Sequence, residues 1–132
     1  MPRVLSTLAL IGALSFGCTH SNSPSGMLPL STTLSVGQQA TLSGLTVTFV
    51  AVTADSRCPI DANCFVAGDA TLQFNLSANQ RTARVDLQVE RTDKSRATHE
   101  NYVFGVQTLT PYPSASKPIT QADYRATVLV SR

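Results

Sequence analysis

The feature that most constrains this chain is a regular alternation of apolar and polar residues. Over residues 70–77, Ala, Leu, Phe and Leu occupy every second position, and Thr, Gln, Asn and Ser occupy the positions between them. Because successive side chains of an extended strand point to opposite faces, this pattern predicts a half-buried β-strand. From residue 30 onward no stretch has the three-to-four-residue spacing typical of an amphipathic helix. We therefore expect an all-β domain.

The same alternation recurs along the chain and predicts about seven strands. Short sequences that favour turns separate them, among them Ser-Gly, Ala-Asn-Gln and Thr-Asp-Lys-Ser, and β-branched residues are frequent within them. Short strands with regular turns are typical of an antiparallel β-sandwich or a small barrel. Of the two we predict the sandwich, in an immunoglobulin-like form, over residues 31–132. The predicted strands cover residues 33–36, 40–42, 45–52, 70–77, 83–89, 102–106 and 124–130.

Length and composition limit the classes of function. The 132 residues suffice for one domain, and 10 Lys and Arg against 8 Asp and Glu give a charge of only +2, too small for a nucleic-acid-binding surface. There is no Gly-rich phosphate loop, no serine-hydrolase motif and too few His and Cys for zinc. We expect a non-catalytic protein without cofactor or metal. One catalytic arrangement is not excluded by the sequence. This is a pair of carboxylates that strand pairing brings together.

The N-terminal segment predicts export from the cytoplasm. Arg3 precedes a 13-residue run without charge, from Val4 to Phe16. Positive charge, an apolar core and then small residues are the order typical of a signal peptide. As a helix the run would span about 20 Å, which is short of the roughly 30 Å hydrocarbon core of a membrane. We predict a signal peptide over residues 1–17.

Gly17 and Cys18 resemble the lipobox of bacterial lipoproteins, in which the cysteine becomes the lipid-bearing first residue of the mature chain. The usual leucine lies one place early, at Leu14, and Phe16 stands where a small residue is typical. The sequence from Ser15 to Gly17 also fits an ordinary signal peptidase. Both routes cut before Cys18, so lipidation and simple secretion are the two alternatives.

The number of cysteines favours lipidation. The chain has three, and an exported protein with an odd number leaves one thiol without a partner. Cys58 and Cys64 are close neighbours and form the natural pair, so a lipid on Cys18 accounts for the third. Residues 18–30 are rich in Ser, Pro and Gly, which predicts a flexible tether. Thr19 after the cysteine resembles the signal for outer-membrane sorting in a cell with two membranes.

The segment between two predicted strands, residues 55–68, has the highest density of unusual residues in the chain and reads DSRCPIDANCFVAG. An exported chain meets oxidising conditions, so we predict a disulfide between Cys58 and Cys64. Their C-x5-C spacing differs from the C-x-x-C of thiol oxidoreductases. Closing so short a loop stabilises a domain by about 2 kcal/mol in the chain-entropy account, and Pro59 stiffens the enclosed turn.

This segment resembles a family of small exported bacterial proteins, often lipoproteins, whose usual pattern is DSRCP-x4-C-x-W-A-G. The chain departs from that pattern at Val66, where the family has Trp. The resemblance covers about residues 34–130 and implies export and a β fold, but it implies no particular activity. The matching residues are Asp55, Ser56, Arg57, Cys58, Pro59, Cys64, Ala67 and Gly68.

Three roles stay open for the segment. It is a structural staple, a recognition loop or a cation site. A recognition loop would contact an envelope protein, or inhibit an exported hydrolase, with Arg57 as the anchor, because a pinned loop loses little entropy on binding. Its contact residues would be Asp55, Arg57, Pro59, Ile60 and Asp61.

A cation or small-ligand site would use the oxygen atoms of Asp55, Asp61, Asn63 and Asp69, although their spacing lacks the acidic ladder of an EF-hand loop. The sequence as a whole predicts a structural or protein-binding lipoprotein of the cell envelope. Its expected contacts are the membrane, through a lipid such as palmitate on Cys18, and an envelope protein.

Overall fold

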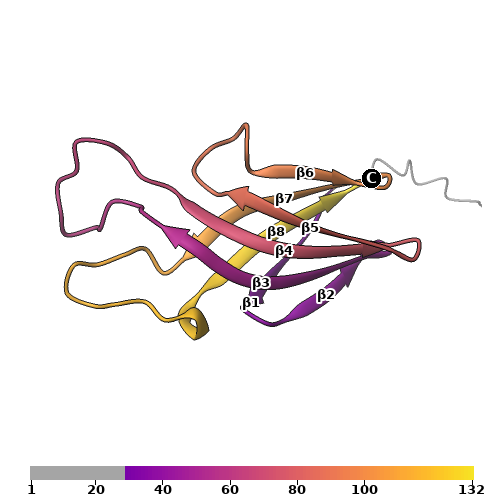
Figure 1. Ribbon diagram of the computed structural model, residues 1–132, viewed down its shortest axis with the longest axis horizontal. Helices are drawn as coiled ribbons and strands as arrows, with labels where there is room; N and C mark the ends of the chain where they lie inside the picture. Colours follow the sequence, from indigo (N-terminus) through magenta and orange to yellow (C-terminus); the bar gives the residue numbers. More distant parts are fainter. Residues whose placement is uncertain (1–28) are drawn as a thin grey trace, which may run out of the picture.

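The computed structural model describes residues 29–132, so the predicted signal peptide, Cys18 and almost all of the predicted tether lie outside the described residues. The described chain is built from strands and one short 3-10 turn, which confirms the all-β prediction (Figure 1). Within residues 29–132 no helix is long and apolar enough to cross a membrane. The elements are β1 (Leu30–Ser35), β2 (Gln39–Leu42), β3 (Leu45–Asp55), β4 (Ala70–Ala78), β5 (Arg81–Gln88), β6 (Arg96–His99), β7 (Tyr102–Thr110), η1 (Gln121–Asp123) and β8 (Arg125–Ser131).

The strands form two antiparallel four-stranded sheets, with orders β1-β8-β7-β6 and β2-β3-β4-β5, so the predicted sandwich is confirmed. Strands that follow one another in sequence pair within a sheet, except where the chain passes between sheets at β1–β2 and β5–β6. An immunoglobulin domain has Greek-key connections. The strand order here is instead a meander closed by the pairing of β1 with β8, which corrects the immunoglobulin-like expectation.

The described chain has eight strands, against about seven predicted. The additional strand, β6, has only four residues, and it follows a turn sequence that suggested a connection. Its pairing with β7 joins His99 to Tyr102 across a tight hairpin, where Glu100 has a φ of 53°. Because β6 carries little hydrophobic alternation of its own, the tertiary pairing determines this strand.

The core lies between the sheets and is centred on three phenylalanines. Phe74 stacks on Phe49 with ring centroids 5.0 Å apart and meets the edge of Phe104 at 4.9 Å, which joins the two sheets. Most alternate positions predicted to face inward are buried. Ala51 is an exception, because a bulge after Phe49 shifts the register of β3 and brings Val52 into the core instead.

The bulge in β3 is held by the side chain of Gln121, which lies in the connection between β7 and β8 of the other sheet. The Val52 N–H donates to Gln121 Oε1 at 3.0 Å, and Gln121 Nε2 donates to the Val52 carbonyl at 2.9 Å. One glutamine thereby satisfies both polar groups of Val52. This contact ties η1, and the loop that precedes it, to the end of β3.

Candidate functional site

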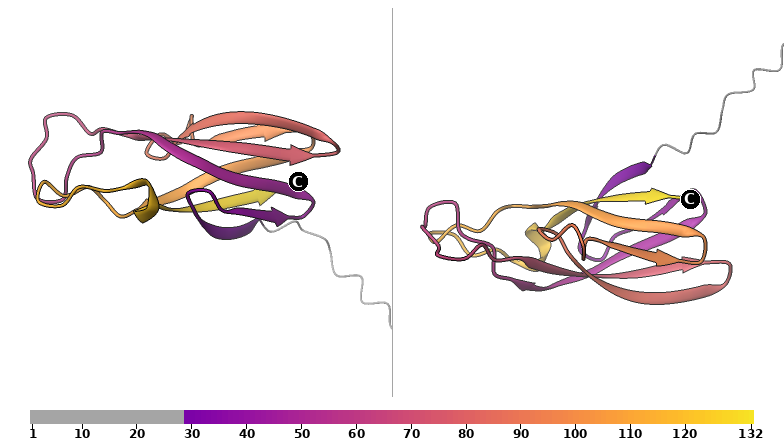
Figure 2. Two further views of the ribbon diagram at one scale, coloured as in Figure 1. Left: turned by 60° about the horizontal axis from the view of Figure 1, so that its bottom comes forward. Right: turned by 90° about the horizontal axis from the view of Figure 1, so that it is seen from above.

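Two long loops leave the sandwich at one end and lie side by side in both views of Figure 2. We name residues 56–69 the cysteine loop and residues 111–120 the proline loop. The described chain begins and ends at the other end of the molecule, where Leu30 pairs with Val130 (Figure 1). The cysteine loop therefore lies at the end remote from the start of β1.

Arg57 connects the two loops from the inside. Its guanidinium makes a bidentate pair with Asp55, with Nε–Oδ1 and Nη2–Oδ2 distances of 2.9 and 2.7 Å. Nη1 donates to the Leu109 carbonyl at 2.7 Å and Nη2 to the Pro111 carbonyl at 2.9 Å. The Tyr112 ring covers the guanidinium with its centroid 4.6 Å from Cζ. Arg57 is only 3% exposed, so it has no free face for a partner and holds the loops together instead.

The buried Arg57 and the largely buried Asp55 form an ion pair, and Tyr124 contacts it. The Tyr124 hydroxyl donates to Asp55 Oδ2 at 3.0 Å. Burial alone would raise the pKa of Asp55, but hydrogen bonds from Arg57 and Tyr124 and the charge of Arg57 outweigh it and lower that pKa. Burial, followed by the hydrogen bond to Asp55, raises the pKa of Tyr124 to about 12. At neutral pH, Asp55 is therefore an anion held by a cation and a neutral phenol.

The cysteine loop is closed at its base and across its middle. The disulfide between Cys58 and Cys64 is confirmed, with Cα atoms 6.0 Å apart. At the base, the Ser56 N–H donates to the Asp69 carbonyl at 2.7 Å. A Cβ on Gly68 would overlap the Ser56 carbonyl, so only glycine fits there. This requirement gives a physical reason for the glycine in the sequence pattern.

Asp61 fastens the cysteine loop to the proline loop. Its Oδ1 accepts the Ala115 N–H at 2.8 Å, and its Oδ2 accepts the Ser114 hydroxyl at 2.9 Å. These two hydrogen bonds lower the pKa of the Asp61 carboxyl. The Ile60 N–H also donates to the Pro113 carbonyl at 3.0 Å. Asp61 therefore positions the loop, and the half-buried Pro59 lies within the same turn.

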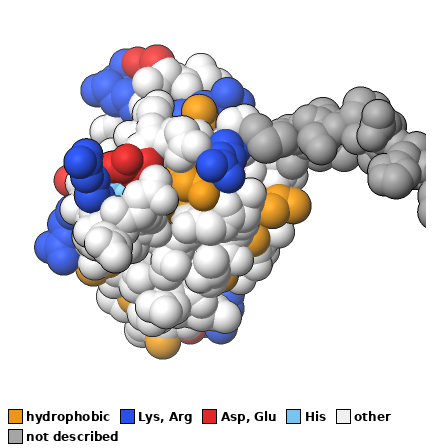
Figure 3. Space-filling view, turned by 90° about the vertical axis from the view of Figure 1, so that its right-hand side faces the viewer, with side chains coloured by type: hydrophobic (Ala, Val, Ile, Leu, Met, Phe, Trp, Pro, Cys, Tyr) orange, Lys and Arg blue, Asp and Glu red, His pale blue; other side chains and the backbone are white. Residues whose placement is uncertain are grey.

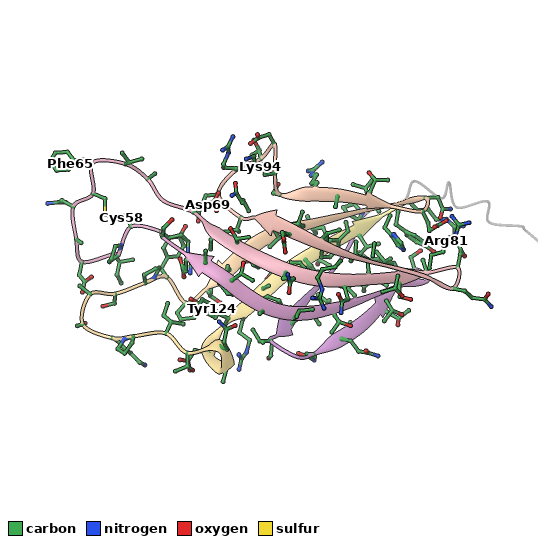
Figure 4. All side chains as sticks on the ribbon, in the orientation of Figure 1. Cys58, Phe65, Asp69, Arg81, Lys94 and Tyr124 are labelled. Carbon is green, nitrogen blue, oxygen red and sulfur yellow. A yellow bond between two sulfur atoms is a disulfide. The ribbon has the colours of Figure 1, made fainter. Side chains whose placement is uncertain are left out.

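Beyond these contacts the cysteine loop exposes three large apolar side chains, which we name the apolar tip. Ile60, Phe65 and Val66 are 75%, 109% and 80% exposed. Figure 4 shows Phe65 at the far end of the loop, directed away from both sheets. The opposite end, seen in Figure 3, has basic side chains and only small scattered apolar areas. The tip is therefore more apolar than the face at the opposite end.

The sequence predicted Ile60 as a contact residue of the loop, but not Phe65 or Val66. The available signal was two adjacent apolar residues after Cys64, in a short closed loop with no alternation and nothing to pack against. The partners of Arg57 in the proline loop were also missed. They lie more than 50 positions along the chain, and only the packing of the two sheets brings the end of β7 near the end of β3.

The four residues considered for cation binding are not brought together. Asp55 faces Arg57, Asp61 faces the proline loop, and Asn63 is exposed. Asp69 Oδ1 accepts the backbone N–H groups of Ala70 and Glu90. Across residues 29–132 there is no group of three or more His, Cys, Asp or Glu side chains arranged to hold a metal ion.

A half-open hollow of about 350 Å³ lies against the proline loop. Its walls include the apolar Pro111, Pro118 and Ile119, with the Lys117 side chain among its polar groups. The volume lies at the lower end of the range for small-molecule pockets.

Comparisons of the chain with protein-family models, with curated proteins and with solved structures find no match. The geometry of the loops and the sequence pattern are therefore the evidence on function.

Proposed function

We propose that this chain is a non-catalytic lipoprotein of the cell envelope that binds an envelope protein through its cysteine loop. Export by a signal peptide over residues 1–17 and a lipid on Cys18 belong to the same proposal. The apolar tip is the observation that carries it, because three large apolar side chains stand in solvent on a loop that the rest of the fold immobilises. Exposed apolar groups of this kind are typical of interaction surfaces.

The fixed shape of the loop supports a role in binding. The disulfide, the buried Arg57 and the hydrogen bonds of Asp61 hold it from three sides. A loop that is already ordered loses little conformational entropy when a partner binds. The contact residues differ from the predicted set, because Arg57 and Asp61 position the loop while the apolar tip faces outward.

The position of the loop also agrees with a lipid anchor. β1 begins at Leu30, at the end remote from the cysteine loop. A lipid on Cys18 would attach the chain from that side, with the loop presented away from the anchor. Cys18→Ser should abolish incorporation of labelled palmitate and release the protein from the membrane fraction. Palmitate labelling and membrane association equal to the unaltered protein would exclude the anchor.

Binding is tested by cross-linking in cells. A photoreactive residue at Ile60 should yield one dominant protein adduct, to be identified by mass spectrometry. The matched control carries the same group at Arg84, which is exposed on β5, away from the loop. Equal background products from both positions would leave the loop a structural staple and contradict the proposal.

Inhibition of an exported hydrolase is a narrower form of the same proposal. A protruding loop pinned by a disulfide can enter a cleft, and the apolar tip gives it side chains to place there. If the cross-linked protein is a hydrolase, the purified chain should reduce its activity with one-to-one stoichiometry. A hydrolase that stays fully active in the complex would exclude this form.

A further inference from the structure

We infer that the partner is a protein with a concave apolar cleft that receives the apolar tip, with Phe65 as the central anchor. This inference rests on the proposed function, because it takes the cysteine loop as the binding end. The partner would present an apolar cleft, and the contact residues of this chain would be Phe65, Ile60 and Val66.

The exposure of the tip requires a partner whose surface surrounds these side chains. Phe65 is 109% exposed, so no other part of the described chain shields its ring, and Ile60 and Val66 are nearly as open. Removing such side chains from water is favourable only when apolar atoms surround them. A flat polar surface would leave the ring largely in water. A cleft encloses it, and aromatic anchors in pockets commonly dominate binding energy.

The tip is ordered before it binds. Phe65 directly follows Cys64 of the disulfide, and the Ile60 N–H is bonded to the Pro113 carbonyl at 3.0 Å. Gly68 fixes the return of the chain two residues after Val66, because it packs against the Ser56 carbonyl. The spacing of the three side chains is therefore set by the fold, and this favours a partner of matching shape over a deformable surface.

The charges near the tip favour a protein over a lipid bilayer. Loops that insert into anionic membranes are usually flanked by several Lys or Arg. In the cysteine loop the one basic residue is Arg57, which is buried and paired with Asp55, while the carboxylate of Asp61 lies beside Ile60 at the surface. Lys117 is the one basic residue of the proline loop. So little basic charge gives weak attraction to anionic lipid. Asp61 is exposed, and although its oxygens already accept hydrogen bonds from the proline loop, its negative charge matches basic groups at the rim of a cleft.

The test uses the full-length protein and compares matched variants. The protein cross-linked from Ile60 is identified, purified and titrated against unaltered chain, Phe65→Ser, Phe65→Leu and Val103→Ser by calorimetry. Val103 is a fitting control because it is also an exposed apolar residue, 39% exposed, near the opposite end of the sandwich. Phe65→Ser should weaken binding more than tenfold, Phe65→Leu less than about threefold, and Val103→Ser should leave it unchanged. All variants should keep the melting temperature of the unaltered chain, since these side chains are exposed.

The outcomes separate the inference from the proposed function. If a partner is captured but Phe65→Ser binds as tightly as the unaltered chain, the cleft inference fails and the proposed function stands. If nothing is captured, both fail. A second copy of this chain as the adduct would overturn the cleft inference. So would Phe65-dependent binding of the Cys18→Ser protein to phosphatidylethanolamine–phosphatidylglycerol vesicles.

Discussion

At the scale of single residues, Arg57 shows how burial changes the meaning of a charged side chain. All three guanidinium nitrogens donate hydrogen bonds, to Asp55, Leu109 and Pro111, and the residue is 3% exposed. From sequence alone, Arg57→Ala is expected to weaken a complex while the fold survives. Because the structure buries the guanidinium, we expect the substitution to act on the fold first.

Arg57→Ala should lower the free energy of unfolding by about 3 kcal/mol, the lower end of the range for a broken buried pair, because it leaves the largely buried Asp55 carboxylate without its cation. Urea denaturation monitored by circular dichroism measures this change. Arg84→Ala, on the exposed face of β5, should change it by less than about 0.5 kcal/mol. Equal stability of the two variants would show that the ion pair does not hold the loops.

The same pair predicts a pH dependence. The pKa of Asp55 is lowered from 3.8 in the folded protein, so the stabilisation is fully present above that value and is lost as the pH falls through the lower, folded-state pKa. Thermal denaturation between pH 2 and 6 should show a smaller acid-induced loss of stability in Asp55→Asn than in the unaltered chain. Parallel curves for the two proteins would assign the acid loss to other carboxylates.

At the scale of elements, the loops depend on two attachments that are made by side chains and not by strand pairing. The disulfide closes the cysteine loop within itself, and Gln121 ties η1 to the bulge of β3. Replacing both Cys58 and Cys64 by Ser should lower stability by about 2 kcal/mol, since the unfolded chain gains the entropy of an open loop. An unchanged melting temperature would show that the disulfide is not a structural staple.

Gln121→Ala tests the second attachment. It leaves the N–H and carbonyl of Val52 without partners where the bulge has already removed ladder bonds. We expect a loss of about 1–3 kcal/mol in the free energy of unfolding, the cost typical of an unsatisfied buried polar group. Gln107→Ala, at an exposed position of β7, is the matched control in the same urea titration. An equal loss of stability in the two variants would mean that water satisfies the N–H and carbonyl of Val52 when Gln121 is removed.

The elements also show how far the sequence predicts this structure. Period-two alternation located β4 and the core face of β8, because a single buried face determines every second residue. It failed at β6, which is too short to show a period, and at Ala51, where a bulge reverses the faces. The disulfide was predictable from the cysteine spacing. The role of Arg57 was not, because the carbonyl groups of Leu109 and Pro111 that it contacts lie more than 50 positions along the chain.

At the scale of the whole molecule, the two sheets form a rod-like scaffold with the termini of the described chain at one end and the paired loops at the other (Figure 1). The sheets are joined mainly through the core, because the chain crosses between them at only two corners of the described sandwich. The position of the apolar tip therefore depends on core packing, and a cavity in the core should weaken the whole scaffold.

Phe104→Ala tests this dependence. Phe104 is fully buried on β7, and its ring meets Phe74 of the opposite sheet, so truncation leaves a cavity between the sheets. A loss of about 3–5 kcal/mol is expected, as for other buried phenylalanines. Val103→Ala, the exposed neighbour on the same strand, should change stability by less than about 0.5 kcal/mol. Two probes follow the unfolding of Phe104→Ala in urea: circular dichroism, and the fluorescence of a label at position 65. If the sheets form one cooperative unit, the two probes will give the same urea midpoint. An earlier transition at the label would mean that the loops unfold independently of the core.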